Sequence, residues 1–90
     1  MRTTHVIVEG LVQGVSFRES TRRQAFVLGL TGWVRNRRDG SVEAMLCGPP
    51  DKIDPMLQWL RRGPSRSRVD ELHIREVVGE EQFTSFEIRF

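Results

Sequence analysis

The stretch Gly10-Leu-Val-Gln-Gly-Val-Ser-Phe-Arg18 joins two segments of different periodicity. The apolar segment Val6-Ile7-Val8 before it is typical of a strand, and the residues after it recur at helical spacing. The stretch is therefore the loop of a strand–loop–helix junction, with a glycine near each end of the loop. Glycine allows positive φ and lets the backbone approach a ligand closely.

The start of the predicted helix favours an anion site. Ser16 and Glu19 have the spacing of a capping box, which predicts that the helix begins near Phe17. Arg18 then lies in the first turn, where a positive charge opposes the helix dipole, whereas the free N–H groups at a helix N-terminus suit an anion. An arginine there is better explained if a dianion lies between it and the loop amides, so we predict a phosphate-binding loop. The alternative is an ordinary βα turn whose arginine points into water.

This loop differs from two well-known phosphate-binding motifs. Its glycines are too close together for a Walker loop and no Lys-Ser/Thr pair follows, and it lacks the Gly-x-Gly-x-x-Gly fingerprint.

Length and charge limit the possible functions. Ninety residues form one small domain with a modest core. The balance of 14 basic against 12 acidic residues, a net charge of +2, is too mild to indicate nucleic acid or an acidic membrane surface. The single cysteine, Cys47, excludes an intramolecular disulfide and fits a reducing compartment. We find no apolar signal core and no apolar run near the roughly 20 residues of a membrane span, so we expect a soluble, cytoplasmic protein.

Periodicity and turn signals predict the other elements. Strands are expected at residues 4–9, 30–37, 41–47, 69–78 and 86–90, and helices at residues 17–28 and from 51 to just before Gly63. We predict a C-cap at Gly29, a hairpin turn at Arg38-Asp39-Gly40 and a turn at residues 79–82. The expected buried faces of the two helices comprise Phe17, Thr21, Ala25 and Leu28, and Ile53, Met56, Leu57 and Leu60.

The order β-α-β-β-α-β plus a short C-terminal strand predicts an α+β fold of the ferredoxin-like, split βαβ type. This fold is an antiparallel sheet with two helices on one face. Right-handed crossover makes the first two strands parallel, with the third strand between them. Their C-terminal ends then lie at the same end of the sheet, roughly 10 Å apart. The predicted loop leaves the first strand there and Asn36 ends the second, so we expect the two to converge.

Two segments resemble the signatures of a known family. The first is Gly10-Leu-Val-Gln-Gly-Val-Ser-Phe-Arg18, and the second is Gly32-Trp-Val-Arg-Asn-Arg-Arg-Asp-Gly-Ser-Val-Glu43. They resemble the Gly-x-Val-Gln-Gly-Val-x-Phe-Arg and Gly-x-Val-x-Asn-x-x-Asp-Gly-x-Val motifs of acylphosphatases. The chain departs from the family in having a leucine after Gly10 where arginine is frequent.

The resemblance implies one domain over residues 1–90 that hydrolyses the carboxyl–phosphate bond of small acyl phosphates, without metal or cofactor. It implies that Arg18 is the catalytic arginine that binds phosphate and that Asn36 positions the attacking water. The implied phosphate loop consists of the amides of Gln13, Gly14, Val15, Ser16, Phe17 and Arg18. The plainer interpretation of Asn36 is that it satisfies the nearby hairpin turn.

The side chains available for catalysis are consistent with the hydrolysis of an acyl phosphate. Cys47 lies in a predicted strand, and Ile53 occupies the arginine position of a Cys-x5-Arg phosphatase motif. His5 and His73 lie in separate strands, where we expect structural roles, and no cluster has metal-ligand spacing in sequence. An acyl phosphate can still be hydrolysed, because its carboxylate leaves without a proton. Catalysis then requires an oriented water and a stabilised phosphoryl charge. We hypothesise that the proton of the water passes to a phosphate oxygen.

Two other functions compete with the enzyme. A non-catalytic phosphate-binding module would keep the loop but lack a positioned water, and Asn36 argues against it. An RNA-binding domain of the same topology needs aromatic side chains on the open faces of the central strands. Residues 4–9 and 41–47 offer none, and Trp33 is expected to serve core or edge packing. We therefore expect a monomer that binds an acyl phosphate, with phosphate or sulfate competing, and that binds neither nucleic acid nor membranes.

Overall fold

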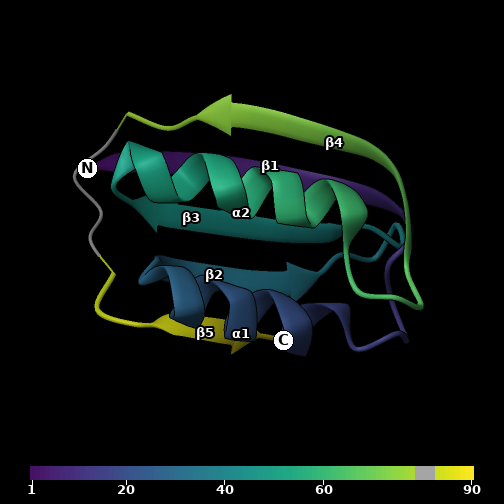
Figure 1. Ribbon diagram of the computed structural model, residues 1–90. Coiled ribbons are helices and arrows are strands. Elements are labelled where there is room, and N and C mark those ends of the chain that lie inside the picture. Colours follow the sequence, from purple (N-terminus) through teal and green to yellow (C-terminus); the bar gives the residue numbers. More distant parts are fainter. Residues whose placement is uncertain (79–82) are drawn as a thin grey trace.

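The computed structural model describes residues 1–78 and 83–90, and the turn predicted at residues 79–82 lies outside them. The elements are β1 (Arg2–Leu11), α1 (Phe17–Leu28), β2 (Thr31–Asn36), β3 (Val42–Gly48), α2 (Pro50–Arg62), β4 (Arg68–Glu76) and β5 (Phe86–Arg89). Both helices cover the same face of a five-stranded sheet (Figure 1). The predicted ferredoxin-like α+β fold is confirmed.

The strand order is β4-β1-β3-β2-β5. Because β1 and β2 both pair antiparallel with β3, they run in the same direction on either side of it, as predicted. The sheet is nevertheless mixed, because β5 pairs in parallel with β2. The prediction of a wholly antiparallel sheet was therefore wrong at this edge. As Figure 1 shows, β4 ends at the end of the sheet where β2 begins, so the next strand runs beside β2 in the same direction.

The first strand is longer than predicted. β1 continues to Leu11, with a bulge between Glu9 and Gly10 in its pairing with β4. Gly10 has φ 136°, and a Cβ atom there would lie 2.0 Å from the carbonyl oxygen of Arg68. Gly10 therefore serves the close packing of two strands rather than a ligand, and the loop itself spans only residues 12–16.

The first helix begins at Phe17, as predicted, but the predicted capping box was wrong. Ser16 is the N-cap residue, yet its backbone is left-handed (φ 60°, ψ 28°) and its side chain makes no capping hydrogen bond. Side-chain capping normally uses an extended N-cap residue, so this backbone is unsuitable for it. Glu19 pairs with Arg22 and Arg23 instead. At the other end, the predicted C-cap Gly29 has φ 72°.

The core lies between the sheet and the helices. The predicted face of α2 is fully confirmed, and on α1 three of the four predicted residues are buried, with Leu28 half-buried. The rings of Phe17 and Trp59 lie 6.1 Å apart and join the two helices. Side chains from the sheet that are fully buried include Val6, Val8, Val34, Val42, Ala44 and Leu46. Full burial of each large apolar side chain contributes about 1.5–3 kcal/mol, so this layer fixes where the ends of β1 and β2 lie.

Candidate active site

A cavity of about 380 Å³ lies where β1 and β2 end. It is lined by residues of the loop, the start of α1, the end of β2 and β5, namely Val12, Gly14, Ser16, Phe17, Arg18, Glu19, Asn36, Ile88 and Phe90. Arg18 and Asn36 come from different elements, and the structure brings them to one cavity, as the predicted topology required.

The residues at the start of α1 that line this cavity carry backbone N–H groups without a partner in the helix. The first hydrogen bond of α1 runs from the N–H of Ser20 to the carbonyl oxygen of Ser16, at 3.0 Å. The N–H groups of residues 17–19 therefore have no partner within the helix. Gly14 (φ 75°) and Ser16 (φ 60°) both adopt left-handed backbone conformations, which are typical of concave anion-binding turns. A Cβ atom at Gly14 would meet nothing within 4 Å, so the loop backbone is open there.

Arg18 supplies the positive charge of the cavity. Its guanidinium carbon lies 4.9 Å from the centroid of the Phe90 ring. Within the described residues, no carboxylate lies within salt-bridge distance of Arg18. Glu19 lines the same cavity, but the hydrogen bond from Arg22 lowers the pKa of Glu19 and engages its carboxylate. The guanidinium of Arg18 is thus available to an anion.

Asn36 supplies an unpaired acceptor. It is the last residue of β2, and its Oδ1 atom is buried and has no hydrogen-bond partner among the described residues. A buried acceptor without a partner is rare and calls for an explanation such as a bound water. The nearby turn does not need Asn36, because Asp39 accepts hydrogen bonds from the backbone N–H and the hydroxyl of Ser41 at 3.0 and 2.6 Å. These bonds also lower the pKa of Asp39.

Two of the six predicted phosphate-loop residues do not line the cavity. Val15 packs against the core, and the side chain of Gln13 turns away toward the β2–β3 turn. Sequence reasoning missed Val12, Glu19, Ile88 and Phe90 as cavity residues. Ile88 and Phe90 carry an alternating signal in the sequence, but their place depends on β5 lying beside β2, which the sequence pattern did not indicate.

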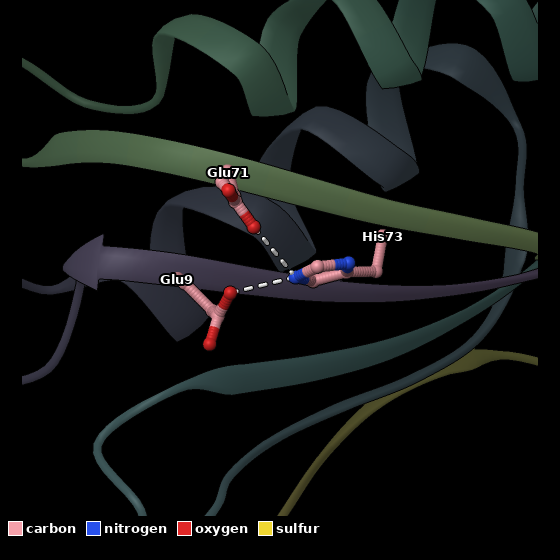
Figure 2. A group of neighbouring side chains, drawn as sticks. All are labelled: Glu9, Glu71 and His73. Atoms are coloured by element: carbon pink, nitrogen blue, oxygen red, sulfur yellow. Dashed lines mark hydrogen bonds and ion pairs between the residues drawn. The ribbon is translucent and has the colours of Figure 1, made fainter.

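A second group of polar side chains lies on the face of the sheet away from the helices (Figure 2). The Nε2 atom of His73 lies 2.6 Å from a carboxylate oxygen of Glu9 and 3.1 Å from one of Glu71. The register of β1 with β4 places Glu9 opposite Glu71, which sequence spacing could not show. All three are exposed, and the hydrogen bond with Glu9 raises the pKa of His73. Since both carboxylates contact the same ring nitrogen, we interpret the group as a surface ion pair.

The other histidine and the tryptophan also have structural surroundings. His5 pairs with Glu43 at 2.6 Å. Trp33 is 8% exposed, and the guanidinium carbons of Arg35 and Arg89 lie 5.4 and 5.0 Å from its ring centroid. The ring is therefore not open to stacking by a base, which argues against the RNA-binding alternative. Among the described helices, none is long and apolar enough to cross a membrane.

Comparisons with known proteins agree on one family. Residues 4–88 match the family model Acylphosphatase. An acylphosphatase of Bordetella avium is 48% identical over 86 residues, which cover 96% of this chain and 92% of that protein. The crystal structure of acylphosphatase from Bacillus subtilis has a TM-score of 0.96 at 33% identity and covers all of both chains. An acylphosphatase structure from Coxiella burnetii has a TM-score of 0.92 at 43% identity and covers 98% of this chain and 92% of the other.

Proposed function

Because this chain belongs to the acylphosphatase family and is an enzyme that hydrolyses acyl phosphates, we propose that Arg18, the loop amides and Asn36 carry out that reaction. Arg18 and the backbone N–H groups at the start of α1 bind the phosphoryl group, and Asn36 orients the water that attacks phosphorus. The products are a carboxylate and inorganic phosphate.

The phosphoryl group is held by a charge and by several dipoles. The guanidinium of Arg18 can donate two parallel hydrogen bonds to phosphoryl oxygens. The N–H groups of residues 17–19, which have no partner within the helix, lie at the positive end of the helix dipole. Donors fixed in advance stabilise the charge that spreads over the phosphoryl oxygens in the transition state. We include the amides of residues 13–16 in this set, with the left-handed residues Gly14 and Ser16 giving the loop its concave form.

The water is activated by position rather than by a base. The buried Oδ1 atom of Asn36 accepts a hydrogen bond from the water. An amide is too weak a base to remove the proton, so the proton passes to an oxygen of the phosphoryl group. The acyl oxygen leaves as a carboxylate, which needs no proton at neutral pH. No step requires a metal ion or a cofactor.

One observation supports this proposal above all others. A guanidinium without a carboxylate partner and a buried acceptor without a donor, both within the described residues, line the same cavity. A module that only binds phosphate requires the first of these groups but not the second. The catalytic proposal accounts for both.

The first prediction separates binding from chemistry at Asn36. In the Asn36→Ala variant we expect kcat with benzoyl phosphate to fall by about 100-fold or more, because an interaction made in the transition state is lost. The inhibition constant of inorganic phosphate should stay near the wild-type value. Thermal unfolding of the same preparation provides the control. Near-normal turnover in a destabilised protein would assign Asn36 to the turn and remove it from the mechanism.

The same assay tests the chemical class. Wild-type activity should persist in EDTA, and an aryl phosphomonoester should be a poor substrate, because its leaving group needs a proton. Loss of activity in EDTA that zinc or magnesium restores would contradict the proposed mechanism.

We further propose a monomeric, single-domain enzyme over residues 1–90 that acts in the cytoplasm on small acyl phosphates, with phosphate and sulfate as competing anions. The matched family covers residues 4–88, and the single cysteine, Cys47, is a free, buried thiol. A free thiol is compatible with a reducing compartment.

A further inference from the structure

The side chain of Gln13 connects two segments that are far apart in sequence. Its Nε2 atom donates one hydrogen bond to the carbonyl oxygen of Arg37 at 2.8 Å and another to that of Ser41 at 2.9 Å. Both hydrogens of the carboxamide are thus used. Gln13 belongs to the loop after β1, whereas both acceptors belong to the turn between β2 and β3.

The turn is already closed by its own hydrogen bonds. The N–H of Arg37 donates to the carbonyl of Ser41 at 2.8 Å, and the N–H of Gly40 donates to that of Arg37 at 3.3 Å. Asp39 accepts the two hydrogen bonds from Ser41 described above. Both carbonyls therefore have a backbone donor without Gln13, since a carbonyl oxygen can accept two hydrogen bonds. What the Gln13 bonds add is the connection between the turn and the loop.

This connection lies next to both parts of the proposed site. Gln13 directly precedes Gly14, and Arg37 directly follows Asn36; Gly14 and Asn36 both line the cavity. A Cβ atom at Gly14 would meet nothing within 4 Å, so no side-chain packing acts at that residue itself. The distance from bound phosphorus to the water on Asn36 depends on how the loop and the turn are placed. A misplacement of about 1 Å can reduce a rate by about 100-fold.

We propose that Gln13 is a positioning residue that sets the separation between the phosphate-binding loop and Asn36. The proposal rests on the proposed roles of Arg18 and Asn36. Gln13 does not touch the substrate through its side chain, and it acts on turnover through the position of Asn36.

Two variants of Gln13 test this role. Gln13→Met keeps the length of the side chain but removes both donors, and Gln13→Asn keeps the donors but shortens the reach by one methylene. Each should lower kcat with benzoyl phosphate by about tenfold or more. Each should leave the phosphate inhibition constant within about threefold of wild type, because Arg18 and the loop amides remain. Either variant that folds decides the question.

Asp39→Ala is the matched control. It removes the two hydrogen bonds from Ser41 but keeps both carbonyls that Gln13 contacts. We expect a lower melting temperature than wild type with kcat within about twofold, since a structural loss alone does not move the turnover of the folded fraction. If kcat falls in proportion to the melting temperature in both Asp39→Ala and Gln13→Met, the role of Gln13 is merely structural and the proposal is overturned.

A double-mutant cycle identifies the residue through which Gln13 acts. If it acts through Asn36, then adding Gln13→Met to Asn36→Ala should lower kcat no further, because the effects of coupled residues are not additive. Fully additive losses, or a rise in the phosphate inhibition constant as large as the fall in kcat, would contradict the proposal. If Asn36→Ala retains turnover, the proposed function fails. If Asn36→Ala loses turnover and Gln13→Met retains it, only the present inference fails.

Discussion

Arg18 lies where two opposing effects on stability nearly cancel. A positive charge in the first turn of α1 opposes the helix dipole, at a cost of about 0.3–1 kcal/mol. Its position over the Phe90 ring contributes about 0.5–1 kcal/mol. With no carboxylate partner among the described residues, this arginine therefore adds little to the stability of the protein.

This near-cancellation gives a prediction for Arg18→Gln. We expect kcat/KM with benzoyl phosphate to fall by about 1,000-fold or more, since the substitution removes the positive charge that we propose binds the phosphoryl oxygens. Arg18→Lys should restore little, because a point charge cannot replace two parallel hydrogen bonds. In phosphate-free buffer, the melting temperature should stay near that of wild type.

Added phosphate should then distinguish the two proteins. A ligand that binds only the folded state stabilises it by RT ln(1 + [L]/Kd), about 2.7 kcal/mol at 100 times Kd. The melting temperature of wild type should rise more than that of Arg18→Gln. Equal shifts would indicate a general salt effect and would count against the anion site.

Not every residue of the site could be inferred from the sequence. The convergence of Arg18 with Asn36 followed from element order, because right-handed crossover leaves one way to place the first two strands. The contacts of Gln13 could not be inferred, because its acceptors are backbone carbonyls, which every residue carries. The capping box failed because the backbone at Ser16 is left-handed, and a Ser–Glu spacing does not encode that.

Among the elements, α2 carries a residue that works against its own helix. Pro55 lies inside the helix on its exposed side, although its ring removes one backbone hydrogen bond. The helix stays continuous because Ile53, Met56, Leu57 and Leu60 hold it against the core. The packing of the apolar face thus outweighs local propensity.

Pro55→Ala should therefore stabilise the protein. The regained helical hydrogen bond is worth up to about 3 kcal/mol, and the greater freedom of the unfolded chain takes back about 1 kcal/mol. We expect a gain of about 2 kcal/mol in the free energy of unfolding by urea, with unchanged kcat, because α2 does not line the cavity. Gln58→Ala, on the exposed surface of the same helix, is the control and should change stability by less than about 0.5 kcal/mol. A less stable Pro55→Ala protein would show that the proline is accommodated without cost.

The types and order of the elements were well predicted, because long periodic segments carry strong signals. Their boundaries and pairing were predicted less well. β1 runs two residues further than expected because the bulge at Glu9/Gly10 keeps it paired with β4. The parallel edge pair of β5 with β2 was missed, because alternation in residues 86–90 indicates a strand but not its neighbour.

For the whole molecule, the free energy of unfolding should depend on pH through the pair of Glu9 in β1 and His73 in β4. The hydrogen bond with Glu9 raises the pKa of His73 above its usual value near 6.5. The stabilisation is therefore fully present below about pH 6.5 and is lost as pH rises through the higher pKa of the folded state. We expect the stability difference between wild type and His73→Gln to shrink over that range in urea unfolding from pH 5.5 to 9. An NMR titration of His73 with a midpoint at or below 6.5 would contradict this prediction.

The strand order also governs how the chain folds during its synthesis. β1 is made first, yet its partners β3 and β4 and the cavity residues of β5 all follow later in the chain. At about 5–20 residues per second, β1 waits seconds on the ribosome for its neighbours β3 and β4 to be synthesised. A nascent chain that already contains Arg18 and Asn36 still lacks the wall formed by Ile88 and Phe90. The enzyme should therefore gain its activity in a single late step, when residues 86–89 add the last strand beside β2.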